Sequence, residues 1–233
     1  MALLTESGFL FLLRWIHFLS GITWIGLLYY LNFAQVPFFA ETDAPVRSGA
    51  QQKLLPRVMW WFRWGAMITF LSGWLYLLHF WLGKVGFAAG AGPWAILLGG
   101  LLGSLMWANV WFVIWPNQKI VIDNAVNTAA GKPANPAAAA AGARAGLASR
   151  TNVLFSIPML FFMGAASHLP LGLPRSGLAF WLVALIIMAA IEYNALTGTP
   201  GKGPSKPLAT VKDTLWAGFV LTLVYYAWFE IMR

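Results

Sequence analysis

The sequence predicts an all-α protein, a polytopic bundle of about six transmembrane helices with both termini on the periplasmic side. Composition is the first reason: 60% of the 233 residues are hydrophobic and 9% are charged, with a mean hydropathy of +0.70. Soluble domains carry about 25% charged residues. A spanning helix needs about 20 mainly apolar residues. Six segments reach that length, and together they make residues 1–233 a single integral membrane domain: 9–33, 58–82, 94–115, 152–170, 177–196 and 214–232.

The loops between these segments alternate between basic and neutral, which predicts the topology. Basic loops stay on the cytoplasmic side of a membrane. The two remaining loops contain only Lys84 and Arg175 as basic residues. We therefore expect a multi-pass protein of the bacterial inner membrane, with lipid as its main surroundings. The basic loops are 34–57 with Arg47, Lys53 and Arg57, 116–151 with Lys119, Lys132, Arg144 and Arg150, and 197–213 with Lys202, Lys206 and Lys212.

Composition also excludes several classes of site and partner. The chain has no cysteine, which excludes disulfides, thiolate metal sites and covalent attachment of haem through a Cys-x-x-Cys-His motif. The net charge of +8 is scattered among loops, so it indicates orientation in the membrane and no nucleic-acid partner. The N-terminus lacks the basic region and the cleavage site of a signal peptide, so we expect the first apolar segment to remain in the mature protein.

Local patterns predict how some of the segments pack. Asn135 is a good N-cap and precedes an alanine-rich run, so 135–150 is expected to form a short cytoplasmic connecting helix. Gly99 and Gly103 form a small-xxx-small pair that favours close packing of the third segment on a neighbour. Met159 and Met163 lie one turn apart, and we expect core packing there rather than a soft-metal ligand set.

Arg14 and His17 are the polar residues that set the first segment apart. They lie three positions apart in an otherwise apolar run, so a helix places them on one face. The other two histidines are His79, near the outer end of the second segment, and His168, just before Pro170 at the outer end of the fourth. The predicted topology therefore puts all three histidines in the outer half of the membrane.

The neighbours of two histidines suggest a flat cofactor. Gly21 lies one turn deeper than His17 on the same face, and Gly164 lies one turn deeper than His168. A macrocycle beside its axial ligand needs a position without a bulky side chain, and imidazole is a common ligand of haem iron. We therefore expect a b-type haem held by His17 and His168, with Arg14 pairing with a propionate.

Other interpretations of these residues stay open. Arg14 can reach the lipid headgroups instead, and His79 can be an interfacial residue, although it remains a third candidate metal ligand. Copper bound by histidine and methionine is the weaker alternative to haem. Glu192 and Glu230 can serve a proton path or lie at the membrane interface.

Four segments resemble the N-terminal membrane domain of the bacterial membrane-bound urate hydroxylases: RWIHFLSGITWIG (14–26), WWFRWGAMITFLSGW (60–74), IWPNQKIV (114–121) and SRTNVLFSIPMLFFMGAASHLP (149–170). His17 falls on the family's Trp-x-His pattern in the first helix, and His168 falls on its His-x-Pro pattern after the fourth. His79 has no counterpart in the pattern. The family members continue into a cytochrome c domain, and we expect no such domain here because the sequence has no cysteine.

These observations favour an integral membrane redox protein that binds haem near the periplasmic face and transfers electrons. The resemblance implies a separate electron acceptor, and the outer location of the expected haem suits exchange with a soluble periplasmic cytochrome c. One alternative is a membrane enzyme that oxidises urate or another purine and passes electrons to a separate cytochrome. Another is an accessory subunit of a larger respiratory or oxygenase complex, without a cofactor. No residue is assigned a catalytic role from the sequence.

Overall fold

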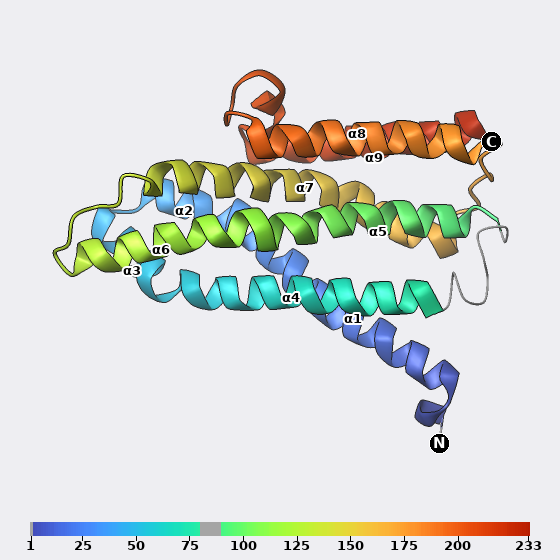
Figure 1. The fold of residues 1–233 in the computed structure, drawn as a ribbon, viewed down its shortest axis with the longest axis horizontal. Coiled ribbons are helices and arrows are strands. Elements are labelled where there is room, and N and C mark those ends of the chain that lie inside the picture. The colour runs from blue at the N-terminus through green and yellow to red at the C-terminus, as the bar shows by residue number, and fades with distance from the viewer. Residues whose placement is uncertain (1, 80–89) are drawn as a thin grey trace.

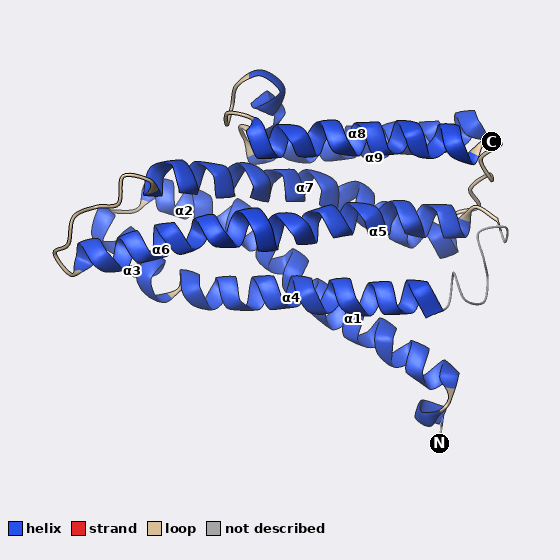
Figure 2. Cartoon of the chain, viewed as in Figure 1, coloured by secondary structure: helices blue, strands red, loops and turns tan. Residues whose placement is uncertain are grey.

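The computed structural model describes residues 2–79 and 90–233, and within them it contains helices and no strand (Figure 2). The all-α class predicted from the sequence is confirmed. Shorter 3₁₀ helices cover Ala2–Leu4 and Gly203–Leu208, and π-helical segments cover Tyr30–Gln35 and Asn109–Ile114. The α-helices are α1 (Glu6–Tyr29), α2 (Val36–Glu41), α3 (Ala44–Lys53), α4 (Leu55–Tyr76), α5 (Gly92–Ala108), α6 (Trp115–Ala129), α7 (Ala138–His168), α8 (Gly177–Thr197) and α9 (Val211–Met232).

Five continuous helical stretches among the described residues are long and apolar enough to cross a membrane. They are Glu6–Glu41, Gly92–Ala129, Ala138–His168, Gly177–Thr197 and Val211–Met232. The predicted span 58–82 corresponds to α4, which is a 22-residue helix but is not among the five. It contains Arg57 and Arg63, and the last residues of the predicted span, 80–82, lie outside the described part of the chain.

The long helices run side by side, with their connections gathered at the two ends of the bundle (Figure 1). Both termini lie at one end, and the segments that contain the basic loops, around α2, α3, the start of α7 and 198–210, lie at the other. This arrangement agrees with the separation of basic and neutral loops in the sequence. α7 is central because it packs against α5, α6, α9 and the π-helical segment Asn109–Ile114.

The environment of α1 changes along its length. Its main neighbour is α4, and its N-terminal half projects beyond the rest of the bundle (Figure 1). Phe11 and Trp15 on this half are 58% and 52% exposed. Large apolar side chains that face outward from a membrane helix contact lipid, so this exposure is compatible with a lipid-facing surface.

Two of the long helices are interrupted by a π-helical segment, and a proline follows each interruption. Pro37 lies two residues after Tyr30–Gln35, and Pro116 lies two residues after Asn109–Ile114. Proline lacks the N–H that an α-helix needs, and a local π turn is one way in which a membrane helix accommodates it. π turns are rare and occur frequently at functional sites. Each segment contains a buried amide: Asn32 is 4% exposed and Asn109 is 1% exposed.

The expected short connecting helix over 135–150 is instead the first part of α7, which continues without a break from Ala138 to His168. Asn135 is not the N-cap of this helix: the N-cap is Ala137, which makes no side-chain capping bond, and the Asn135 side chain accepts a hydrogen bond from the Ala137 N–H at 2.9 Å in the turn before it. The prediction of a separate helix is wrong because no turn residue separates the alanine run from the apolar segment that follows. Gly142 and Gly146 are tolerated inside the helix.

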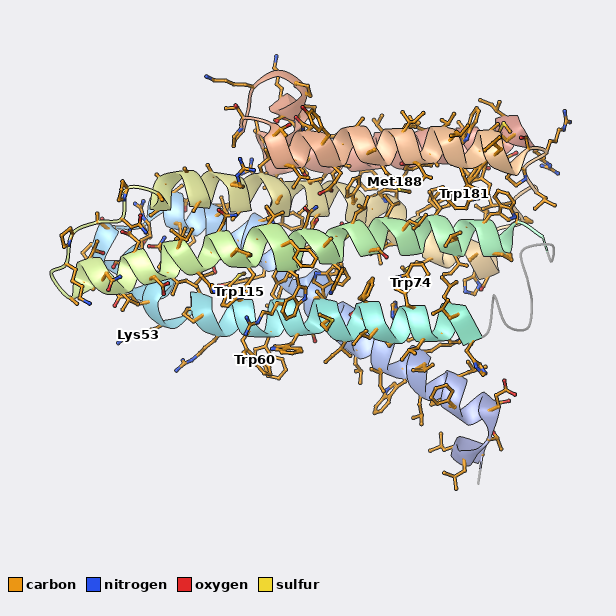
Figure 3. All side chains as sticks on the ribbon, in the orientation of Figure 1. Lys53, Trp60, Trp74, Trp115, Trp181 and Met188 are labelled. Carbon is orange, nitrogen blue, oxygen red and sulfur yellow. The ribbon has the colours of Figure 1, made fainter. Side chains whose placement is uncertain are left out.

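Arg63 shows how the bundle accommodates a charge inside α4. Its guanidinium lies 4.1 Å from the centroid of the Trp115 ring and 5.7 Å from that of Trp111. Figure 3 shows Trp115 between α6 and α4. A cation over an indole face is stabilised by the ring quadrupole, more strongly where water is excluded. The indole rings therefore stabilise the Arg63 charge between two helices.

Gly99 and Gly103 allow α5 to approach α7 closely, as the small-xxx-small pattern predicts. A Cβ added at Gly99 would lie 3.0 Å from Met163 Cγ and 3.1 Å from the Met159 carbonyl oxygen. A Cβ added at Gly103 would lie 3.3 Å from Met159 Sδ. Met159 is 4% exposed, so its predicted place in the core is confirmed.

This contact predicts the effect of a larger side chain at Gly99. We expect Gly99→Leu to lower the free energy of unfolding by about 1–3 kcal/mol, because the side chain would push α5 away from the α7 backbone. The measurement is denaturant or thermal unfolding of the purified protein in detergent. Gly100→Leu is the matched control, since no atom lies within 4 Å of a Cβ added there. Equal stability of the two variants would contradict close packing at Gly99.

An aromatic cluster joins α7, α8 and α9 toward the end of the bundle that carries the termini. The Phe229 ring lies 4.5 Å from Phe180 and 5.5 Å from Phe162, measured between centroids, and all three side chains are fully buried. Trp94 on α5 contacts Phe180 and stacks on Trp181, which Figure 3 shows between α5 and α8. Aromatic packing therefore holds the last two helices on the central one.

Candidate functional site

His17 lies on α1 with its imidazole against α4. Its Nδ1 is 2.9 Å from the Thr69 carbonyl oxygen and 3.3 Å from Ser72 Oγ. Because a carbonyl oxygen can only accept, the Nδ1 atom carries the hydrogen, and Nε2 of the neutral ring keeps its lone pair. Gly73 makes room for the ring, since a Cβ added there would lie 2.8 Å from His17 Cε1. The ring is thus fixed in orientation and tautomer by α4.

Arg14 lies one turn nearer the N-terminus and also contacts α4. Its guanidinium donates a hydrogen bond to the Tyr76 hydroxyl and lies 4.7 Å from the centroid of the same ring. One turn beyond His17, the Ser20 hydroxyl accepts a hydrogen bond from Thr69 Oγ1 at 2.9 Å. Arg14, His17 and Ser20 therefore form a polar stripe on α1 that meets polar groups of α4. These contacts hold α1 against α4. Arg14 is nevertheless exposed.

The two glycines predicted to leave room for a macrocycle have different surroundings. A Cβ added at Gly21 would lie 3.8 Å from Thr69 Cγ2, so Gly21 packs on α4. Nothing lies within 4 Å of a Cβ added at Gly164, which is exposed on α7. Space beside the helix is therefore present at Gly164, whereas α4 occupies the space beside Gly21.

The other histidines lie apart from the polar stripe on α1 and α4. His168 is the last residue of α7 and is exposed, at the same end of the bundle as the N-terminus (Figure 1). No contact recorded among the described residues joins it to His17. His79 pairs with Glu6, with 2.8 Å between Nε2 and Oε1, and its ring meets Phe9 edge-on. Across residues 2–79 and 90–233, no three His, Asp or Glu side chains form a metal-binding group.

A buried polar cluster deeper in the bundle escaped the sequence analysis apart from its glutamate. Asn109 Nδ2 donates to Asn152 Oδ1 at 3.0 Å and to Glu192 Oε2 at 3.1 Å. Asn152 Nδ2 donates in turn to the Met106 carbonyl oxygen at 2.9 Å. The cluster joins α5, α7 and α8, and Asn109 and Asn152 are 1% and 0% exposed.

α7 extends this polar surface toward α1. The Ser156 hydroxyl bonds the Tyr29 hydroxyl at 2.8 Å, and the Ser149 hydroxyl accepts from Asn32 Nδ2 at 2.8 Å. Ser149, Asn152 and Ser156 follow at intervals of three and four, which is one helical face. The buried polar contacts of α7 could have been predicted from this spacing, because three polar side chains on one face of an apolar segment indicate polar partners on neighbouring helices.

Comparison with known proteins gives one match. The family model described as urate oxidase N-terminal matches residues 81–224, which is more than half of the chain. No curated protein and no solved structure matches. The matched region includes Gly164, His168 and the cluster of Asn109, Asn152 and Glu192. Arg14, His17, Gly21 and His79 precede it. The match covers more than half of the sequence, and the chain belongs to the urate oxidase N-terminal family.

Proposed function

We propose that this membrane protein binds a b-type haem through His17 near the end of the bundle that carries the termini, and that it transfers electrons. The observation that supports the proposal is the state of the His17 ring. Nδ1–H is held by the Thr69 carbonyl, and no hydrogen-bond partner of Nε2 is recorded among the described residues. Histidine ligands commonly donate their second ring N–H to a backbone carbonyl, which fixes the ring and raises its basicity.

The surroundings of His17 include a cation that can pair with a carboxylate of the proposed haem. Arg14 is one turn away and exposed, so its guanidinium can form a fork onto a carboxylate while Tyr76 stacks beneath it. His168, next to the open surface at Gly164, is the proposed second ligand. Haem, when bound, supplies reversible one-electron chemistry at its iron. The chain's own residues orient the ligand ring, bind the carboxylate and exclude water with apolar side chains.

The proposed orientation follows from charge. The basic loops gather at the end of the bundle opposite the two termini (Figure 1), and basic loops stay cytoplasmic. His17 lies in the half of α1 that is nearer the N-terminus. His17 then lies toward the periplasm of a bacterial inner membrane. Such a position suits electron exchange with a soluble periplasmic cytochrome c.

An absorption spectrum of the protein, extracted in mild detergent and combined with elemental analysis, tests the proposal. We expect a Soret band, sharper visible bands after reduction with dithionite, and iron close to one atom per chain. Copper without iron would favour the weaker alternative, although Met159 and Met163 pack on α5 rather than on a histidine. A preparation without a Soret band and without iron would refute haem binding.

Family membership favours a second function, oxidation of urate or a related purine with a separate cytochrome as acceptor. The expected result is urate-dependent reduction of added cytochrome c by the purified protein. A haem spectrum without turnover on any purine would support electron transfer alone. Absence of both haem and turnover would favour an accessory subunit of a larger respiratory or oxygenase complex.

A further inference from the structure

Glu192 is a carboxyl group within a transmembrane helix whose recorded partner is neutral. Its Oε2 accepts one hydrogen bond, from Asn109 Nδ2 at 3.1 Å, and the side chain is half-buried. No basic nitrogen forms an ion pair with it among the described residues. An ionised carboxylate in a low-dielectric interior is costly without a cationic partner. Taking up a proton removes that cost.

Several charged groups on the elements that pack against α8 have recorded partners other than Glu192. Arg144 of α7 donates to the Leu196 carbonyl. Arg150 of α7 donates to the Leu208 and Ala209 carbonyls. Tyr225 of α9 donates to the Ala184 carbonyl at 3.3 Å. α5 contains no titratable side chain, and Lys206 in Gly203–Leu208 is exposed, as is Tyr193 on α8 itself. The recorded partner of the carboxyl group among the described residues is therefore an amide rather than a cation.

Asn109 gives this position the properties of a binding site. It is 1% exposed, both hydrogens of its Nδ2 are used, and its Oδ1 is buried without a hydrogen-bond partner among the described residues. A buried polar atom without a partner requires an explanation. A side-chain amide carries both a donor, NH₂, and an acceptor, C=O. A rotation of the Asn109 amide by half a revolution exchanges the two, so Asn109 can donate to the carboxylate or accept from the protonated acid.

We propose that Glu192, Asn109 and Asn152 form a proton-binding site inside the bundle. The step is the uptake of one proton by the carboxylate to give the neutral acid, with no other reactant. Asn152 positions Asn109 by bridging it to the Met106 carbonyl. Glu192 lies five residues before Thr197, about 7–8 Å from the end of α8, so protons enter from the end that carries the basic loops. The site is separate from His17, and its test requires no haem.

Infrared difference spectroscopy of the full-length protein in lipid nanodiscs, titrated with acid, tests this site. We expect a carboxylic-acid C=O band that shifts in heavy water and is absent in Glu192→Gln. Glu230→Gln is the matched control because Glu230 pairs with Arg233 at 3.6 Å near the chain end, and this variant should keep the band. The chain has only seven acidic side chains, which makes the assignment tractable. An unchanged spectrum in Glu192→Gln would overturn the proposal.

A second variant tests the amide. Asn109→Leu removes the hydrogen bond to the carboxylate, and we expect the midpoint of the Glu192 band to rise by about one pH unit or more. Asn32→Leu, at another buried amide that bonds Ser149 instead, should leave the midpoint unchanged. An unmoved midpoint in Asn109→Leu would overturn the three-residue site. If these variants do not fold, the wild-type titration decides: a Glu192 step that coincides with the exposed carboxyl groups would refute the proposal.

Discussion

The His17→Ala variant is expected to lose the Soret band of the purified protein, with haem occupancy reduced about tenfold or more. The substitution removes the imidazole whose Nδ1 is held by the Thr69 carbonyl and whose Nε2 is proposed to bind iron. Alanine supplies no ligand in its place. The measurement is the ratio of Soret to protein absorbance, together with the iron content, after purification in mild detergent.

His79→Ala is the matched control for this experiment. His79 follows α4 and lies beside the N-terminal end of α1, where its Nε2 is bound to Glu6 at 2.8 Å, and its side chain is 43% exposed. The control should keep the Soret band, because an exposed ion pair contributes little to stability and the residue is engaged elsewhere. Full haem occupancy in His17→Ala would exclude His17 as the ligand. Loss of haem in both variants would point to loosened packing of α1 on α4.

The Phe229→Ala variant is expected to show the largest loss of stability, about 3 kcal/mol or more in the free energy of unfolding. Phe229 is fully buried and contacts Phe162 of α7 and Phe180 of α8. Truncation leaves a cavity where three helices meet, and their packing interactions are the main force between helices in lipid. Denaturant unfolding in detergent measures the change.

Phe219→Ala on the same helix is the control, because Phe219 is 54% exposed and its recorded ring contact is with Trp216 rather than with the aromatic cluster. We expect its unfolding to stay within about 0.5 kcal/mol of the wild type. Similar losses in the two variants would show that α9 is held by something other than the Phe162, Phe180 and Phe229 cluster.

The helical class and most spans could be predicted from the sequence because both depend on the length and composition of apolar runs. The ends of helices were less predictable. α7 begins at Ala138 rather than near residue 152, since an alanine run continues a helix beyond the membrane when no turn residue stops it. α4 includes Arg57 and Arg63, and the stabilisation of Arg63 by Trp115 depends on a neighbouring helix.

Only the arrangement of candidate-site residues within a single helix could be predicted from the sequence. Spacing placed Arg14 and His17 on one face, and both side chains do contact α4. Spacing cannot say which helix a face meets, so the packing of Gly21 on Thr69 was not foreseen. The union of Asn109, Asn152 and Glu192 was also not foreseen, because these residues come from three helices and only the packed bundle brings them together.

The π-helical segments Tyr30–Gln35 and Asn109–Ile114 affect which changes in length this chain can tolerate. Deleting one residue from an α-helix turns everything beyond it by about 100°, which would point a lipid-facing surface into the bundle. A π turn already holds one residue more than an α turn. Shortening Tyr30–Gln35 or Asn109–Ile114 by one residue would therefore restore the regular repeat and leave both flanking halves facing their present neighbours. Homologues of different length could thus share one arrangement of helices.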